Sequence, residues 1–219
     1  MKRINEIYRL IIKEYGKNGR YVCKDSVGEL IRTVLSQNTS DVNSERAYSA
    51  LRDRYRSWDM LFKARVSHIV TAIRSGGLAD IKAHRIKNIL KQIKEKEGRL
   101  SLSSLKRLSD EEAFRYLTAL DGVGPKTAAV VLLFCFDRPF MPVDTHIFRA
   151  AKRIGLIHKR CGPAEAHRIL TRITPDEIIK DAHLDLIEHG RRICKAQRPL
   201  CEKCVISIYC DYYEVSENS

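Results

Sequence analysis

A lysine stands in the first turn of an apolar helix in the stretch LDGVGPKTAAVV, residues 120–131. Gly122 and Gly124 give the preceding turn its backbone freedom, and Pro125 suits the first position of the helix. The N–H groups of such a turn and the positive end of the helix dipole together form a binding site for phosphate. Lys126 can contact that phosphate. Because the helix dipole favours the neutral amine, Lys126 can also attack an electrophilic carbon.

A second candidate for chemistry is Asp144, in the stretch MPVDTHIF, directly before another helix. An aspartate at this place commonly caps the helix by accepting N–H groups of its first turn. A carboxylate held ionised there can also stabilise positive charge on a sugar and take up a proton from an amine. The presence of Asp144 favours the interpretation of Lys126 as a nucleophile over that of a phosphate contact alone. His146, two residues further on, either lines the same pocket or packs in the interior.

Four of the seven cysteines lie between residues 194 and 210, in the spacing C-x6-C-x2-C-x5-C; they are Cys194, Cys201, Cys204 and Cys210. Four thiolates this close in sequence can surround one metal centre. Zinc ribbons usually pair two C-x2-C motifs and this chain has one, whereas an iron–sulfur cluster accepts uneven spacing. Lys195 and Arg198 lie between these cysteines and are candidates for contact with phosphate.

Composition and the remaining cysteines limit the function classes. The formal net charge of +13 fits either a binder of polyanions such as DNA or a solvated basic surface. No apolar run approaches the roughly 20 residues of a membrane span, and the N-terminal stretch reads as an amphipathic helix rather than a signal peptide. Cys23, Cys135 and Cys161 are isolated, and the odd cysteine total argues against a disulfide framework. We therefore expect a cytoplasmic protein without membrane contact.

Helical periodicity runs through nearly the whole chain, so the sequence predicts an all-α protein. The predicted helix N-termini carry these caps: Ser26 with Glu29, Asp41, and Ser109 with Glu112. Around the candidate lysine, one helix is predicted over residues 109–119, a tight turn over 120–124 and a second helix over 125–136.

LDGVGPKTAAVV, VDTHIFR and the four-cysteine spacing, in this order, resemble the endonuclease III branch of the helix-hairpin-helix DNA glycosylases over roughly residues 25–212. The resemblance implies two α-helical domains with a DNA cleft between them. One is a six-helix barrel over residues 25–136 that ends in the hairpin at about 109–136. The other combines residues 1–24 with 137–219 and holds a [4Fe–4S] cluster through the four cysteines.

The resemblance also implies roles for individual residues. Lys126 would be the nucleophile, and Asp144 the essential carboxylate, of a bifunctional DNA glycosylase and abasic-site lyase. The hairpin would bind DNA phosphate, alongside a monovalent cation, through Gly122, Val123, Gly124 and Thr127. Leu78, in the stretch GGLADIKAHRI, is similar to the residue that wedges into the base stack, although a buried core leucine is the other interpretation.

In the implied reaction, the damaged nucleotide is flipped out of the duplex, Lys126 attacks C1′ of its sugar, and the base leaves. Asp144 stabilises the positive charge that develops on the sugar. The resulting Schiff base acidifies C2′, and β-elimination cuts the strand on the 3′ side of the site.

One stretch departs from the bacterial pattern of this branch. VLSQNTSDVNS has Asn38 where a gap-filling glutamine is usual, with Gln37 one place earlier. Gln37 and Asn38 either contact DNA or only cap helices. Oxidised pyrimidines are the first expected substrates, and thymine or uracil opposite guanine are the alternative.

A non-catalytic DNA-binding iron–sulfur module is the second alternative, and the presence of both Lys126 and Asp144 argues against it. The expected partner is double-stranded DNA that contains damaged or mismatched bases. We expect the chain to bind it as a monomer, associated with the nucleoid of a prokaryotic-type cell.

Overall fold

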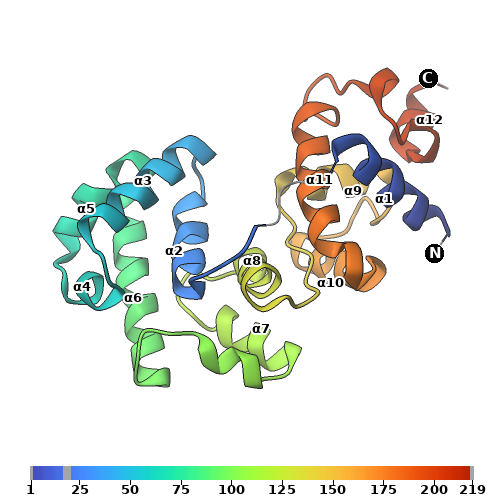
Figure 1. The fold of residues 1–219 in the computed structure, drawn as a ribbon. Helices are drawn as coiled ribbons and strands as arrows, with labels where there is room; N and C mark the ends of the chain where they lie inside the picture. The colour runs from blue at the N-terminus through green and yellow to red at the C-terminus, as the bar shows by residue number, and fades with distance from the viewer. Residues whose placement is uncertain (1, 17–20, 218–219) are drawn as a thin grey trace. The chain divides into compact units, whose positions relative to one another are not determined.

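The computed structural model describes residues 2–16 and 21–217, and over these residues it contains α-helices, short 3₁₀ turns and loops but no β-strand (Figure 1). The predicted all-α class is confirmed. The chain divides into two compact units. We call residues 23–136 the hairpin unit, and residues 1–22 together with 137–219 the cysteine unit.

The hairpin unit contains the helices that position the candidate lysine. Its elements are α2 (Ser26–Ser36), α3 (Asp41–Arg54), α4 (Trp58–Lys63), α5 (Val66–Ile73), η1 (Arg74–Gly76), α6 (Ala79–Glu97), η2 (Ser103–Arg107), α7 (Asp110–Thr118) and α8 (Pro125–Phe136). Helix α2 packs against α3, α6 and α8, and α6 also packs against α4 and α5. Ile86, Ile89, Leu90 and Ile93 of α6 are fully buried, as their spacing of three and four residues requires.

The cysteine unit contains the elements on both sides of the four-cysteine stretch. They are α1 (Lys2–Tyr15), α9 (Thr145–Ile154), α10 (Pro163–Ile173), η3 (Asp176–Ile178), α11 (Ile179–Arg192), η4 (Cys201–Lys203), η5 (Ser207–Tyr209) and α12 (Asp211–Glu217). Helix α11 packs against α1 and α9, and α12 packs against α9. Because α9 begins directly after Asp144, the same helix supports the candidate carboxylate and the C-terminal cysteines.

The helix N-termini are capped partly by residues other than those predicted. Ser109 and Glu112 form the predicted capping box on α7. At α2 the prediction of a box on Ser26 was wrong, because Asp25 precedes it and accepts the Gly28 N–H at 3.0 Å. At α3, Ser40 accepts the Asn43 N–H at 3.3 Å, so Asp41 is the first helical residue rather than the cap.

A disulfide joins Cys23 to Cys135 across 112 positions of sequence, with their Cα atoms 4.8 Å apart. The sequence argument against disulfides was therefore wrong for this pair. The two cysteines lie at opposite ends of the hairpin unit in sequence, and the fold brings those ends together. A count of cysteines carries no information about such a long-range approach, which depends on the packing of the whole unit.

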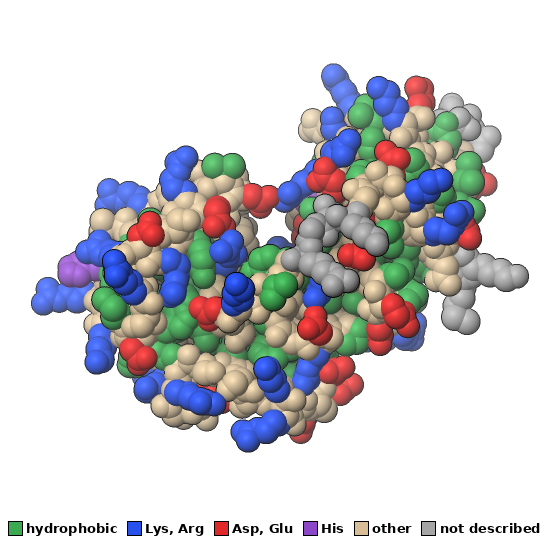
Figure 2. Space-filling view, viewed as in Figure 1, with side chains coloured by type: hydrophobic (Ala, Val, Ile, Leu, Met, Phe, Trp, Pro, Cys, Tyr) green, Lys and Arg blue, Asp and Glu red, His purple; other side chains and the backbone are tan. Residues whose placement is uncertain are grey.

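No helix in the described part of the chain is long and apolar enough to cross a membrane. Lys and Arg side chains are spread over the visible faces of both units, among fewer Asp and Glu side chains (Figure 2). The excess of positive charge is therefore carried by folded surface rather than by one terminal segment.

Candidate active site and cysteine centre

The sequence predicts that both glycines in the turn between α7 and α8 are needed for backbone freedom. The structure shows this need only at the first of them. Gly122 has a φ of +67°, in the left-handed region, and the side chain of Arg85 lies where a Cβ would stand. Gly122 therefore requires glycine for two separate reasons. At Gly124 φ is not positive, and apart from its two chain neighbours no described residue has an atom within 4 Å of the Cβ position.

Side chains of helix α6 that are spaced three and four residues apart hydrogen-bond to this turn, either directly or through Gln37. Asn88 Nδ2 donates to Asp121 Oδ2 at 2.9 Å, and Gln92 Oε1 accepts the Asp121 N–H at 3.0 Å. Arg85 Nη1 donates to Gln37 Oε1 at 2.7 Å, and Gln37 Nε2 in turn donates to the Gly122 carbonyl at 3.2 Å. The turn is thus fixed before any ligand arrives.

The backbone N–H groups of Gly122 and Gly124 donate to no acceptor among the residues that the structure describes. Both glycines are exposed, so these amides remain available to an anion. Lys126 lies in the first turn of α8 with its side chain partly exposed. The turn therefore combines anion-binding amides with an accessible amine.

The other predicted residues of the hairpin unit lie in different surroundings. Val123 is buried, and Thr127 is only 3% exposed, with its hydroxyl 3.4 Å from Gln37 Nε2. Asn38 is exposed and has a φ of 53°. Leu78 is 51% exposed, which excludes the interpretation as a buried core leucine, and it has a φ of 51°.

In the cysteine unit, Asp144 is the N-cap of α9, and its Oδ1 accepts the Ile147 N–H at 2.8 Å. The carboxylate is partly exposed, and the cap uses only one of its oxygens. The second oxygen can therefore accept another hydrogen bond or stabilise a positive charge. The segment before Asp144 is fixed by His183, whose Nδ1 donates to the Pro142 carbonyl at 3.0 Å. His146 contacts Arg149 Nη2 through its Nδ1, at 3.2 Å, and packs against Gly190.

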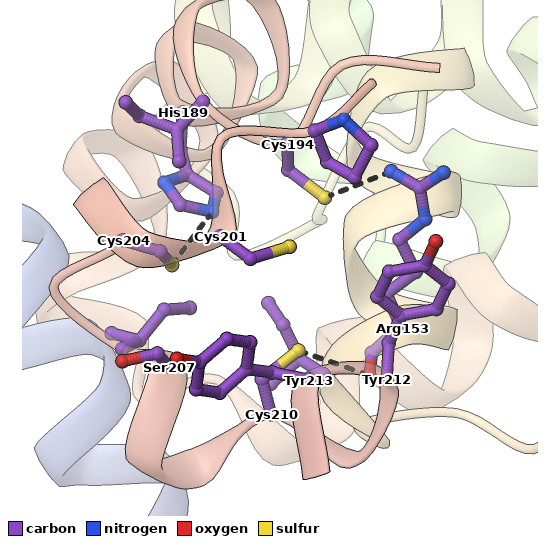
Figure 3. Close-up of a pocket in the computed structure, with 13 residues that line it drawn as sticks. Arg153, His189, Cys194, Cys201, Cys204, Ser207, Cys210, Tyr212 and Tyr213 are labelled. Atoms are coloured by element: carbon purple, nitrogen blue, oxygen red, sulfur yellow. Dashed lines mark hydrogen bonds between the residues drawn. The ribbon is translucent and has the colours of Figure 1, made fainter. Parts of the chain in front are cut away.

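The four cysteines line one cavity, with their sulfur atoms facing a common space (Figure 3). The cavity encloses about 340 Å³ of space, including the part that opens to solvent. Its other walls are largely apolar, formed by Ile154, Ile193, Pro199 and Ile206 among others. Four inward-facing thiols in an apolar cavity are the donor set that a metal centre needs.

Two findings concern the binding of a metal centre in this cavity. No three His, Cys, Asp or Glu side chains in the described part of the chain are arranged to hold a metal ion. Burial raises the pKa values of Cys201 and Cys210, and that of Cys204 to about 11. Metal binding would therefore have to displace protons from these thiols.

Several residues that support the cysteines were not singled out from the sequence. Arg153 donates to the carbonyls of Lys195, at 2.6 Å, and Ala196, at 3.0 Å, and its Nη1 lies 3.5 Å from Cys194 Sγ. Arg149, one turn earlier on α9, donates from Nε to the Cys194 carbonyl at 2.9 Å. The two arginines are four residues apart on the helix that begins within VDTH, and this spacing, which places them on one face of the helix, was the available sequence signal. Lys195 and Arg198 are exposed.

His189 was also missed. Its Nε2 lies 3.9 Å from Cys204 Sγ, and its Nδ1 lies 2.9 Å from the Tyr15 hydroxyl of α1. Burial lowers the pKa of His189 to about 4, so its ring is neutral at physiological pH. The histidine therefore connects the first helix of the chain to the cysteine cavity.

Comparison with known proteins agrees with this arrangement. Residues 31–176 match the family model described as the HhH-GPD superfamily base excision DNA repair protein. The chain is 36% identical to endonuclease III of Thermotoga maritima over 210 residues, 96% of this chain and 93% of that protein. It is 34% identical to endonuclease III of Sulfolobus acidocaldarius over 221 residues, again 96% and 93% of the two chains.

Among solved structures, a trapped endonuclease III–DNA covalent intermediate superimposes with a TM-score of 0.83 and 27% identity, over 99% of this chain and 98% of that one. The match to the superfamily model covers more than half of the chain, and the match to both relatives covers nearly all of it. The chain therefore belongs to the HhH-GPD superfamily of base excision DNA repair proteins and, within it, to the endonuclease III family.

Proposed function

We propose that this chain, a base excision DNA glycosylase and lyase of the endonuclease III family, removes oxidised pyrimidines from duplex DNA through a Schiff base on Lys126. The observation that carries the proposal is the position of Lys126, in the first turn of α8 and directly after a turn with two available amides. A phosphate held by these amides brings the adjoining sugar within reach of the amine.

Each step then follows from a residue of this chain. The hairpin amides hold the phosphate next to the flipped nucleotide, and a monovalent cation bound at the hairpin would add positive charge beside that phosphate. The Lys126 amine attacks C1′, and the C1′–N bond electrons leave with the base. Asp144 stabilises the charge on the sugar and accepts a proton from the amine. The C1′–O4′ bond then breaks, O4′ takes up the proton that Asp144 accepted, and the opened sugar carries an imine between C1′ and Lys126. The imine makes the C2′ proton acidic, and loss of that proton breaks the C3′–O bond and cuts the strand.

The substrate range depends on the loop that follows α2. Asn38 is exposed where the resemblance has a glutamine that fills the gap left by the flipped base. An asparagine side chain is shorter and retains one donor and one acceptor group. Removal of thymine or uracil opposite guanine is the alternative substrate class, and the experiment below distinguishes the two.

For the cysteine cavity we propose a [4Fe–4S] cluster held by Cys194, Cys201, Cys204 and Cys210. The cluster would crosslink the loop that bears Lys195 and Arg198 and so hold both cations in place for contact with phosphate. The purified protein should be brown, with about four irons per chain, and Cys204→Ser should lose both. A colourless protein with one zinc per chain would overturn this assignment.

The test of the activity is borohydride trapping on a panel of duplexes with 5-hydroxyuracil, thymine glycol, T:G, U:G or an abasic site. We expect a covalent adduct with the oxidised pyrimidines, which disappears in Lys126→Gln and persists in Lys106→Gln, an exposed lysine elsewhere in the hairpin unit. Adducts mainly with T:G and U:G would assign the alternative substrate class. Absence of any adduct would show that Lys126 is only a phosphate contact.

Asp144→Asn tests the carboxylate separately from the cap. Asparagine caps helices about as well as aspartate, so the thermal stability should be retained. Base release should fall by roughly a hundredfold or more, because the charge that stabilises the sugar is lost. Unchanged base release in this variant would reduce Asp144 to a helix cap.

We further propose that the chain acts as a monomer in the cytoplasm, in contact with the nucleoid.

A further inference from the structure

A lysine buried in the hairpin unit connects two separate loops. Lys82 lies in the first turn of α6, and the residue is only 1% exposed. Its Nζ donates to the Leu35 carbonyl at 2.7 Å and to the Gly76 carbonyl at 2.9 Å. A lysine is almost never fully buried without partners, because its ammonium group loses its hydration. Both partners here are backbone carbonyls, and they belong to different elements.

Each of these carbonyls belongs to a segment that leads into a candidate DNA-contacting residue. Leu35 lies in the last turn of α2, three residues before Asn38, and Gly76 ends η1, two residues before Leu78. The backbone N–H of Lys82 also donates to the Leu78 carbonyl, at 2.9 Å. Asn38 and Leu78 both have left-handed backbones, which cost energy in residues other than glycine and persist only where the surroundings enforce them.

The helix dipole and the neighbouring charge act on the Lys82 ammonium group in opposite directions. The last carbonyls of α2 carry the negative end of the helix dipole, which favours a cation there. Burial, and after it the charge of Arg85, lowers the pKa of Lys82. Arg85 continues the same network, since it bonds Gln37, which bonds the hairpin at Gly122.

We infer that Lys82 is a positioning residue that fixes the loops bearing Asn38 and Leu78 relative to each other before DNA binds. The inference rests on the proposed function. If both side chains enter the base stack at one lesion, the two loops must keep one spacing as the nucleotide is flipped. Loops that are already fixed avoid the entropy cost of ordering them on DNA. Lys82 would thus act on lesion opening, whereas Lys126 acts on the exposed sugar.

The test compares a substrate that must be opened with one that is already open. Single-turnover strand cleavage is measured on a 5-hydroxyuracil duplex and on a single-stranded oligonucleotide with an abasic site. Lys82→Met should lower the ratio of the duplex rate to the single-strand rate by roughly tenfold or more, as expected for displaced side chains. A general loss of folded protein would lower both rates together and leave the ratio unchanged.

Lys87→Met is the matched control on the same helix. Lys87 Nζ also donates to two backbone carbonyls, those of Phe62 and Ala64, at the end of α4. That variant removes two bonds of the same kind, to carbonyls that belong to neither loop, so its rate ratio should equal that of the wild type. Equal ratios in the Lys82→Met and Lys87→Met variants would overturn the inference.

A second readout does not depend on cleavage. Fluorescence of 2-aminopurine beside a tetrahydrofuran abasic analogue should rise when the wild type or Lys87→Met opens the stack, and should rise much less with Lys82→Met. If the wild type opens the stack but cuts no substrate, and Lys82→Met opens it much less, the proposed function fails while the inference about Lys82 stands. An undiminished rise with Lys82→Met would overturn the inference. If Lys82→Met does not fold, Lys82→Arg keeps a cation and its donors, and a smaller fall in both signals is expected.

Discussion

Gln37 and Asn38 are neighbours in sequence with opposite surroundings. The Gln37 amide lies between Arg85 of α6 and the Gly122 carbonyl of the hairpin, so both of its ends are bonded within the protein. Asn38 is exposed and adopts the left-handed backbone that asparagine tolerates better than most residues. Gln37 therefore contributes to the shape of the site, and Asn38 is the residue of the pair that is open to a ligand.

Substitution of each residue by alanine should separate these two roles. Gln37→Ala should lower the free energy of unfolding by about 1–2 kcal/mol, because it leaves Arg85 and the Gly122 carbonyl without their partner. Asn38→Ala should lower the free energy of unfolding by roughly 1 kcal/mol at most, because alanine tolerates the left-handed backbone less well than asparagine, but it should alter the cleavage rates for a lesion placed opposite each of the four bases. If only Gln37→Ala changes the preference for the opposite base, then Gln37 and not Asn38 is the residue that contacts the DNA.

The roles of residues that stand in a recognisable motif could be predicted from the sequence. The roles of residues whose partners are distant in the sequence could not. Lys126, Asp144 and the four cysteines stand in short motifs whose chemistry follows from residue type and spacing. Lys82 resembles any other lysine on an amphipathic helix, because its partners are carbonyls 6 and 47 positions away. His189 meets its cysteine partner only after 15 further residues have folded back.

At the scale of elements, the capping box on α7 determines where the hairpin begins. Glu112 Oε2 accepts both the backbone N–H and the hydroxyl of Ser109, each at 2.8 Å. The Ser109 backbone N–H, and after it the hydroxyl, lowers the pKa of Glu112 below its ordinary value of 4.5. A carboxyl whose pKa is lowered by folding stabilises the native state only while it is ionised.

The stability provided by Glu112 should therefore be complete above about pH 4.5 and be lost as the pH falls through the lowered folded pKa. Thermal melts of the wild type and Glu112→Gln should differ at pH 6 and converge at the acidic end of the range. Glu111→Gln removes the same charge from the same first turn and serves as the control. A constant difference at every pH would mean that the bond, and not the charge, is responsible.

Most helices followed from periodicity alone, because buried faces such as that of α6 repeat every three to four residues. The hairpin helices were predicted within one residue of their observed ends. Two caps were misassigned by one residue. Asp25 and Ser40 stand directly beside other good capping residues, and the choice among neighbours depends on backbone conformation, which the sequence pattern does not contain.

At the scale of the whole molecule, the Cys23–Cys135 disulfide closes the hairpin unit into a covalent ring. In the chain-entropy account, a crosslink that spans about 100 residues stabilises a fold by up to roughly 4–5 kcal/mol. The double variant Cys23→Ser, Cys135→Ser should therefore melt several degrees below the wild type. Its melting temperature should no longer respond to reductant, whereas that of the wild type should fall.

Cys161→Ser provides the matched control, because Cys161 lies in the cysteine unit and is not disulfide-bonded. That variant should keep the response to reductant. A wild-type melting temperature that is unaffected by reductant would show that the disulfide contributes nothing to stability.

The ring also changes what a break in the backbone does. The chain enters the hairpin unit beside one of the joined cysteines and leaves it beside the other. A protease that cuts any loop between them opens the ring without separating the molecule into pieces, and both halves of the cysteine unit stay covalently connected. After a single cut near residues 99–109, the protein would thus still run as one species on a non-reducing denaturing gel and would separate into two fragments only after reduction.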